Sequence, residues 1–419
     1  MTGNGERRSR ICRKGPGSLA LAAVIMAAVA FPVSVADAND LTATDARIVG
    51  DGARTRFVAD LTERLEIAVF TMADPYRVIV DLPNVRFALP QGVGATGRGL
   101  ISAFRYGQIA PGKSRIVLDA TGPVAVNRYF VIPPADGQPA RLVVDLVPSS
   151  RDRFLEVVRQ QRPTEIATPI APRADRLDAK RRGTRDIRIV IDPGHGGIDS
   201  GAVGATGTLE KTLVLDFSKR LGEALRATGR YDVVMTRDDD SFIPLRKRVE
   251  FARAHDADLF LSVHANSFAG GVEVKGATVY TLSERASDRV AAAVAASENR
   301  ADILAGMDIP EEDSDQVKDI LLDLTRRETK NFGIVFAKNL IASFRDRGIK
   351  LTNDPRKEAS FIVLEAPDVP SALIELGYLS TSAEEELMKS AEWQEKATDA
   401  MIRAIDGYFA TRLARGAGQ

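Results

Sequence analysis

An apolar strand followed by a glycine-rich loop, between residues 187 and 210, constrains the fold of this 419-residue chain more than any other feature. The run Ile189–Ile191 has the continuous β-branched character of a buried strand. Six glycines, which tolerate positive φ and let other groups approach the backbone, follow it: Gly194, Gly196, Gly197, Gly201, Gly204 and Gly207. His195 lies within this loop, and Glu210 begins an amphipathic helical pattern. The stretch therefore places two potential ligands of one metal ion at a strand end and a helix start.

Strands and helices alternate after residue 186, which predicts an α/β catalytic domain over residues 186–415, with a mixed sheet flanked by helices. We expect strands at residues 187–191, 233–236, 259–264, 277–282, 361–364 and 373–376. We expect helices at residues 209–227, 245–254, 286–304, 314–344 and 393–413. Ligands of such folds gather at the ends of the strands, so the polar residues there are the candidates for a site.

Residues 39–148 contain an internal repeat of the form Arg, three apolar residues, Asp, apolar residue. The four copies are residues 56–61, 77–82, 115–120 and 141–146. Each is a short, largely β-branched run bounded by turn residues, which indicates a strand. Four similar strands in two pairs predict a duplicated antiparallel unit, folded as a small all-β sandwich in front of the catalytic domain. This region has no histidine and no carboxylate cluster, so nothing in it suggests catalysis.

The first 38 residues have the pattern of a secretory signal peptide. A basic segment precedes the apolar core 19–35, and Ala36-Asp37-Ala38 fits the small-x-small rule for cleavage near Ala38. The alternative is a membrane anchor, but the apolar core is short and Pro32 interrupts it. We expect an exported, periplasmic protein that meets the membrane only during export. The pair Arg7-Arg8 leaves the choice between Sec and twin-arginine export open.

Charge and cysteine content limit the partners of the mature chain. Lysine plus arginine equals aspartate plus glutamate, at 57 each, so no basic excess suggests a nucleic acid. The single cysteine, Cys12, lies in the signal peptide, so any transition metal must be held by histidines and carboxylates. Residues 149–185 are polar and irregular, and we interpret them as a linker between the two domains.

A third ligand and a base complete the candidate site. His264 ends the apolar run 259–264, and two histidines with one carboxylate, here His195, His264 and Glu210, form a frequent catalytic zinc shell. A carboxylate at Glu375, near the end of another apolar run, is costly to bury unless it is paired or functional. Because a hydrolytic zinc site needs a general base, we assign that role to Glu375.

The third histidine, His255, lies in the polar turn 253–258 and is predicted to be a surface or capping residue. The glycine spacing after the first strand also raises a nucleotide-binding alternative. However, the loop lacks the Gly-Lys-Ser/Thr of a P-loop, and its spacing differs from the dinucleotide fingerprint.

The motifs together resemble one enzyme family, the zinc-dependent N-acetylmuramoyl-L-alanine amidases of the Amidase_3 type. The matching segments, in the order of that family, are residues 192–197, 210–211, 236–237, 245–248, 262–266 and 375–378. The resemblance implies that His195, Glu210 and His264 bind Zn²⁺ and that Glu375 is the catalytic glutamate. The duplicated strands resemble the AMIN domain, which implies binding to peptidoglycan and localisation to the division site.

The resemblance also implies the reaction: hydrolysis of the amide between N-acetylmuramic acid and L-alanine of the peptidoglycan stem peptide, in cell-wall remodelling and daughter-cell separation. From the residues alone only a metal amidase or peptidase follows. Two alternatives therefore stay open, a zinc peptidoglycan carboxypeptidase or endopeptidase, and a catalytically silent wall-binding regulatory protein.

An insertion at about residues 284–325 is expected to regulate the site. Residues 286–304 favour a helix, and the acidic, glycine- and proline-containing segment after them is typical of a loop. Division amidases of this type carry a comparable insertion, which covers the zinc until an activator protein moves it. By that likeness we predict an autoinhibitory lid, with Glu284 or Glu298 as a ligand that plugs the zinc site; a packed structural helix is the alternative.

Overall fold

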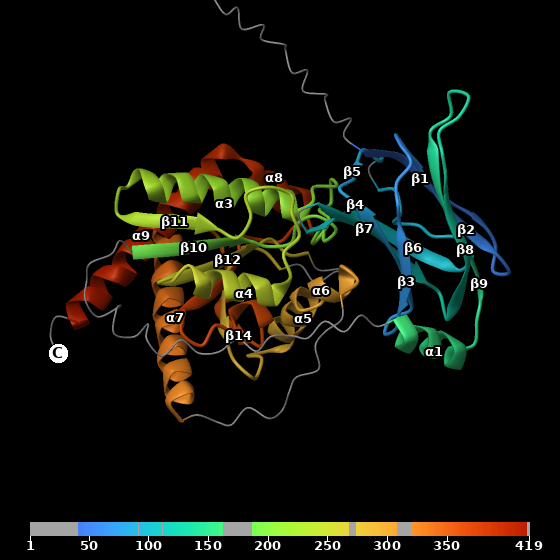
Figure 1. Cartoon of the computed structure of the whole chain (residues 1–419). Helices are drawn as coiled ribbons and strands as arrows, with labels where there is room; N and C mark the ends of the chain where they lie inside the picture. Colours follow the sequence, from blue (N-terminus) through green and yellow to red (C-terminus); the bar gives the residue numbers. More distant parts are fainter. Residues whose placement is uncertain are drawn as a thin grey trace, which may run out of the picture. The chain divides into compact units, whose positions relative to one another are not determined.

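The computed structural model describes residues 41–90, 92–110, 112–161, 187–267, 274–307 and 320–416 (Figure 1). The expected signal peptide lies outside these residues, as do most of the expected linker and residues 308–319 of the insertion. Among the helices described, none is both long enough and apolar enough to span a bilayer.

The N-terminal part is a sandwich of two sheets that share one hydrophobic core. The first sheet has the order β5 (Arg86–Phe87), β1 (Thr42–Gly50), β2 (Thr55–Leu61), β9 (Ala140–Pro148) and β8 (Val124–Ile132). The second has the order β3 (Ala68–Met72), β4 (Arg77–Pro83), β7 (Lys113–Ala120) and β6 (Ile101–Ala110). All neighbours are antiparallel except the short β1–β5 pair.

The four repeats form the central strand pairs of these sheets, as predicted. Strand β2 pairs with β9 in the first sheet, and β4 pairs with β7 in the second. Because side chains alternate along a strand, Phe57 and Val78 face the shared core, whereas the arginine and aspartate of each repeat lie on the outer face. The predicted all-β sandwich is confirmed.

The C-terminal part contains one mixed sheet of six strands. Their order is β11 (Tyr231–Met235), β10 (Ile187–Pro193), β12 (Leu259–His264), β15 (Ser371–Glu375), β13 (Ala277–Leu282) and β14 (Leu351–Ala359). Strands β11, β10, β12 and β15 are parallel, and β13 runs antiparallel to β15. The predicted α/β fold with a mixed sheet is confirmed.

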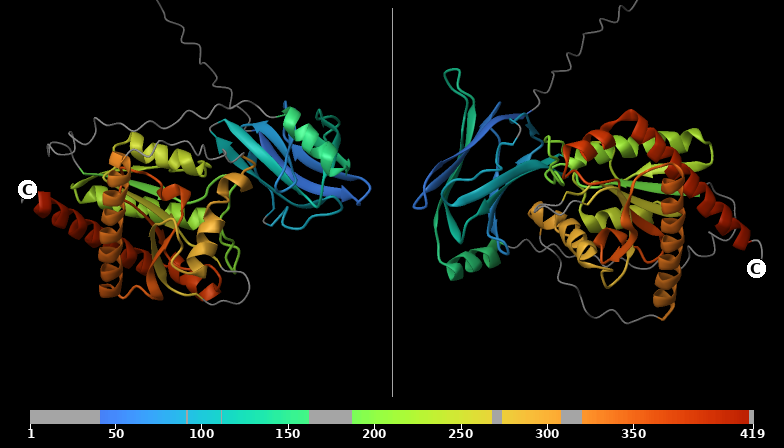
Figure 2. Two further views of the ribbon diagram at one scale, coloured as in Figure 1. Left: turned by 90° about the horizontal axis from the view of Figure 1, so that it is seen from below. Right: turned by 180° about the vertical axis from the view of Figure 1, so that it is seen from behind.

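Helices cover both faces of this sheet, as Figure 2 shows from two sides. One face packs against α3 (Glu210–Ala227), α7 (Ile320–Asp346), α8 (Ser382–Lys389) and α9 (Ala391–Gly416). The other packs against α4 (Leu245–Ala254), α5 (Arg289–Glu298), α6 (Ala301–Leu304) and the 3₁₀ helix η1 (Ile362–Leu364). The strands are buried on both faces, which explains their continuous apolar runs.

Three predicted elements differ from the structure. Part of the expected linker, Arg151–Gln161, is helix α1, because Phe154 is buried in the sandwich core. The expected strand 361–364 is η1, since a four-residue apolar run does not distinguish a strand from another buried turn. The expected helix 286–304 breaks between α5 and α6, where the Asn299 amide bonds the backbone of Ser360 and Ile362.

Two elements of the C-terminal part were not predicted. Strand β14 contains Pro355 and four charged residues, which disfavour a strand assignment, but it is an edge strand, where proline is tolerated. Helix α8 is only eight residues long and precedes α9 by a single residue, so its pattern is short.

Candidate metal centre

Three parallel strands bring the predicted site residues to one edge of the sheet. His195 lies two residues beyond the end of β10, whereas His264 and Glu375 are the last residues of β12 and β15. The register pairs His264 directly with Glu375. Glu210 comes from a helix rather than a strand, as the first residue of α3. The structure therefore brings together all four residues that the sequence selected.

Two glycines are required where the loop backbone meets the imidazoles. A Cβ at Gly194 would lie 2.4 Å from the His264 ring, and a Cβ at Gly201 would lie 2.6 Å from the His195 ring and 2.7 Å from a Glu210 carboxylate oxygen. Gly201 also has a φ of +65°. Any side chain at these positions would displace the histidines, which explains the glycine-rich loop.

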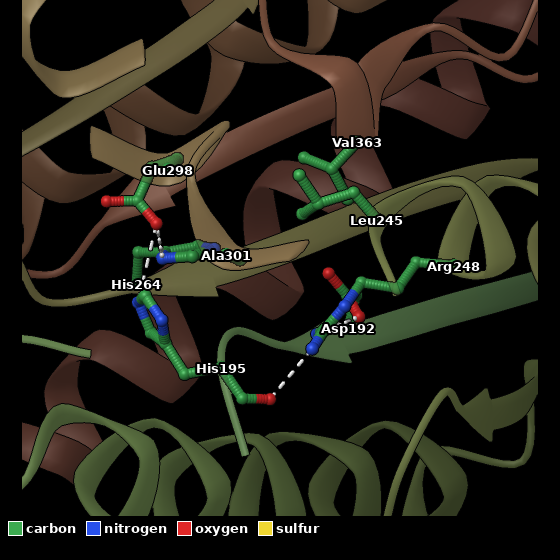
Figure 3. Close-up of a pocket in the computed structure, with 8 residues that line it drawn as sticks. All are labelled: Asp192, His195, Leu245, Arg248, His264, Glu298, Ala301 and Val363. Carbon is green, nitrogen blue, oxygen red and sulfur yellow. Dashed lines mark hydrogen bonds and ion pairs between the residues drawn. The ribbon is translucent and has the colours of Figure 1, made fainter. Parts of the chain in front are cut away.

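Two carboxylates face the same pair of imidazole nitrogens. Glu210 Oε1 lies 3.0 Å from His195 Nε2 and 3.2 Å from His264 Nδ1. Glu298 Oε2, from α5, lies 3.4 Å and 3.1 Å from the same two atoms. Figure 3 shows His195, His264 and Glu298 pointing toward one another. The four side chains are at most 8% exposed, so the group of nitrogen and oxygen atoms is closed to bulk water.

The donor set fits a metal ion on an observation at His195. Its Nδ1 lies 2.8 Å from Asp199 Oδ2, an arrangement that fixes the ring orientation and tautomer. Its buried Nε2 makes no hydrogen bond with any described residue, although Glu210 Oε1 is close. A buried nitrogen without a hydrogen-bond partner, beside a second imidazole and two carboxylates, has the ligand chemistry of a Zn²⁺ site.

The electrostatics of the cluster favour added positive charge. Burial opposes charge on the imidazole, but Asp199, Glu210 and Glu298 hold the pKa of His195 well above its ordinary value. Burial likewise opposes charge on Glu210, yet the two histidines hold its pKa well below the ordinary value. Surroundings that stabilise an imidazolium also stabilise a divalent cation at the same nitrogens.

Glu375 is placed and tuned differently from Glu210. One oxygen, Oε2, accepts a hydrogen bond of 2.9 Å from the backbone of Asn266, while Oε1 is buried without a partner among the described residues. Burial raises the pKa of Glu375 above its ordinary range. A carboxyl group with a raised pKa and one uncommitted oxygen can accept a proton and return it, as a general base must.

Comparisons with known proteins identify the family of this chain. The N-acetylmuramoyl-L-alanine amidase family model matches residues 189–407, and the AMIN domain model matches residues 45–146. The relatives include the N-acetylmuramoyl-L-alanine amidase AmiC of Neisseria meningitidis, 33% identical over 97% of this chain and 98% of the relative. The chain belongs to the N-acetylmuramoyl-L-alanine amidase family.

Two further similarities stand beside this assignment. AmiC of Escherichia coli O6:H1 is 31% identical over 90% of this chain and 91% of the relative. The solved structure of AmiC2 of Nostoc punctiforme is 29% identical, covers 54% of this chain and 99% of that chain, and has a TM-score of 0.37. Because that score is below 0.5, the family assignment depends on the sequence matches.

In the amidase domain, a buried hydrogen-bond network, to which the sequence assigned no role, holds the loop that contains His195, between β10 and α3. Arg248 bonds Asp192 at 2.9 Å and the carbonyl of His195 at 2.7 Å, and it is 2% exposed (Figure 3). Arg237 donates to the carbonyls of Pro193 and Gly194 at 3.0 Å and 2.7 Å. The two guanidinium groups thus fix the backbone on both sides of the histidine. Both arginines lie in segments that matched the family, residues 236–237 and 245–248, but nothing in the sequence indicated what they contact.

The two candidate plug residues of the insertion, Glu284 and Glu298, have different surroundings in this amidase. Glu298 lies at the metal cluster, and its Oε1 accepts a hydrogen bond of 3.2 Å from the Asn266 amide. Glu284 is exposed, away from the cluster, so its candidacy as a plug ligand is wrong. His255 is the C-cap of α4 and stacks on Phe251, in agreement with its predicted capping role.

Proposed function

We propose that this amidase is zinc-dependent and cleaves the bond between N-acetylmuramic acid and the L-alanine of peptidoglycan stem peptides. The observation that carries the proposal is the convergence of His195, His264 and Glu210 on one buried point beside Glu375. His195, Glu210 and His264 would hold Zn²⁺. When bound, the ion supplies Lewis acidity and lowers the pKa of water to about 7.

The protein residues then divide the remaining work. Glu375, with a raised pKa and one uncommitted oxygen, takes the proton of the attacking water and passes it to the leaving amine of L-alanine. Asp199 holds the His195 ring by its Nδ1, and Arg248 holds the backbone carbonyl of the same residue. Holding the reacting groups in position lowers the entropy cost of bringing them together, which the same reaction in water would have to meet.

The test combines metal analysis with product analysis. Purified protein should contain zinc and release intact stem peptides from peptidoglycan, and chelation should abolish the release until zinc is restored. Glu375→Gln should keep the metal but lose between about 10²- and 10⁴-fold in rate. Products cleaved within the stem peptide would instead support the carboxypeptidase or endopeptidase alternative. Bound metal with no cleavage of any bond would support a silent wall-binding protein.

We also propose that α5 and α6 are an autoinhibitory lid. Glu298 lies 3.4 Å and 3.1 Å from the two imidazole nitrogens, so its carboxylate competes with water and substrate for the metal. An activator protein that draws α5 away would open the site. Glu298→Gln should raise the rate measured without any activator, and an unchanged rate with a folded protein would contradict the lid.

We further propose that the protein acts in the periplasm, in wall remodelling during daughter-cell separation, after export and cleavage near Ala38. The AMIN domain would bind peptidoglycan and concentrate the enzyme on its polymer. Fractionation and microscopy of a tagged chain test the location, and binding of the protein to purified sacculi tests the role of the AMIN domain.

A further inference from the structure

Three arginines on the outer face of the β3-β4-β7-β6 sheet bind the end of the lid. Arg77, Arg105 and Arg115 come from the neighbouring strands β4, β6 and β7. Arg77 donates to the carbonyl of Ile303, and Arg105 donates to that of Leu304 at 2.8 Å. Arg115 donates to the next two carbonyls, of Ala305 and Gly306, at 3.0 Å and 2.6 Å.

The four acceptors are consecutive carbonyl groups, those of the last two residues of α6 and of the two residues that follow it. The carbonyl of Ile303 also accepts from the backbone of Gly306, but carbonyls at a helix end generally need donors from outside the helix. Here the AMIN domain supplies all four with charged donors, which form stronger hydrogen bonds than neutral ones.

Two of the three arginines, Arg105 and Arg115, are themselves oriented by carboxylates. Arg115 binds Asp81 through two contacts, of 2.5 Å and 2.9 Å, and Arg105 binds Asp119 at 2.7 Å. These ion pairs hold the two guanidinium groups in one orientation before α6 docks. The arginine side chains therefore lose little conformational entropy on docking.

Apolar packing and close backbone approach accompany these bonds. Ile79 and Val117, between the arginines on the same face, are fully buried against residues of the amidase domain. Gly306 has a φ of +69°, and a Cβ there would lie 2.5 Å from Ile79 Cδ1. Beside them, the backbone of Ile198, in the same loop as His195, donates to the carbonyl of Gln108 in β6 at 3.2 Å.

The same short segment is attached to the amidase domain at its other end. Glu298 reaches the metal cluster, and Asp302 accepts a hydrogen bond of 3.0 Å from the backbone of Leu245 at the start of α4. Only six residues separate Glu298 from Ala305, so the position of α6 constrains the reach of Glu298. A segment held at both ends keeps its carboxylate on the imidazoles at a high local concentration.

We propose that the outer face of the β3-β4-β7-β6 sheet is a latch for the lid, so that the AMIN domain takes part in holding the amidase inactive. The occupant of this surface is the segment of residues 301–307. The inference rests on the proposed autoinhibition by Glu298 and adds to it the surface that keeps the lid in place. Opening of the site then requires release of α6 from the three arginines as well as withdrawal of Glu298.

The test is the double variant Arg105→Gln/Arg115→Lys in the full chain loaded with zinc. It removes donors to Leu304, Ala305 and Gly306 while leaving a positive charge beside Asp81. Hydrolysis of a soluble muropeptide without activator should rise about tenfold, equivalent to about 1.4 kcal/mol. Hydrogen exchange of the amides of residues 289–307 should become faster in parallel.

Two further variants sharpen the result. Gly306→Ala changes only the lid side, and it should raise the same rate and the same exchange because its Cβ meets Ile79. The matched control is Arg128→Gln/Arg56→Lys on the other sheet, where the arginines also bind an aspartate, Asp145, but no lid. This control should leave both readouts unchanged.

The possible outcomes distinguish a failure of the latch from a failure of the proposed autoinhibition or of the proposed amidase activity. If Glu298→Gln raises the rate while the latch variants change neither rate nor exchange, the latch is overturned and autoinhibition stands. Faster exchange without a higher rate also overturns it, because docking would then not control activity. If Glu298→Gln itself has no effect, the lid fails and the latch fails with it, whereas loss of activity in Glu375→Gln still supports the amidase site.

Discussion

The two sheets of the AMIN sandwich carry the same repeat but use it differently. In the first sheet Arg56 stands opposite Asp145, and in the second Arg115 stands opposite Asp81. The Arg56 side chain is 38% exposed, whereas that of Arg115 is 9% exposed because α6 and its carbonyls lie against it. One strand motif thus serves a solvent-exposed ion-pair ladder and a covered docking face.

The aspartates of the repeats show the physical consequence. The hydrogen bond from Arg56, helped by Arg128, lowers the pKa of Asp145 to about 2. Burial raises the pKa of Asp119, the corresponding residue of the covered sheet, above its ordinary value in spite of Arg105. The difference follows from the partners, since Asp145, although its side chain is fully buried, accepts hydrogen bonds from two arginines, whereas Asp119 accepts one from Arg105.

The largest expected difference between the sheets concerns the valine in the middle of each repeat. Val117 and Val143 occupy the same repeat position, and both are nearly fully buried, but only Val117 belongs to a described hydrophobic cluster with the amidase domain. Val117→Ala should cost about 2 to 3 kcal/mol of unfolding free energy, and Val143→Ala about 1 kcal/mol. Urea unfolding measures both, and equal costs would contradict a covered second sheet.

A smaller difference is expected for the aspartates. Asp145→Asn removes a carboxylate whose folded-state pKa is lowered, so it should cost about 1 to 2 kcal/mol at pH 7. Asp119→Asn removes one whose charge is already disfavoured by burial, and its cost should stay within about 0.5 kcal/mol. Thermal unfolding of the two variants at pH 7 measures both costs. A larger cost for Asp119→Asn than for Asp145→Asn would contradict this prediction.

The dependence on pH sharpens the same contrast. Because the pKa of Asp145 is about 2 in the folded chain and about 3.9 in the unfolded chain, its stabilisation is complete above about pH 4 to 5 and is lost as pH falls toward 2. The unfolding free energy of the original chain and of Asp145→Asn should therefore converge over that window. A constant gap between them down to pH 2 would exclude the ion pair as the cause.

The smallest expected effect concerns salt. Arg56 and Arg128 are exposed, so the stabilisation they give through Asp145 should fall by a few tenths of a kcal/mol between about 0.1 M and 1 M NaCl. The contacts of Arg115, which is largely buried, should change less. Unfolding of Arg56→Gln and Arg115→Lys at both salt concentrations compares the two.

Much of the fold and of the site could be predicted because the relevant signals are local. Strand β12 and helix α4 have the predicted bounds, since each is a continuous pattern ending at a clear boundary. His195, His264 and Glu375 could be selected because polar residues at the ends of apolar strands are rare. Helix α1 and η1 escaped prediction, because Phe154 and Leu364 are buried by partners distant in sequence.

The sequence by itself determined the two fold classes, the four residues that converge at the strand ends, and the family. Periodicity, glycines and strand-end residues are properties of short stretches, so they can be read from the chain. Only the tertiary structure decided that Glu298, rather than Glu284, reaches the imidazoles, and that the arginines of one sheet bind the lid while those of the other stay exposed. Those choices depend on which face of each strand another part of the chain covers, and burial of that kind is a property of the folded whole.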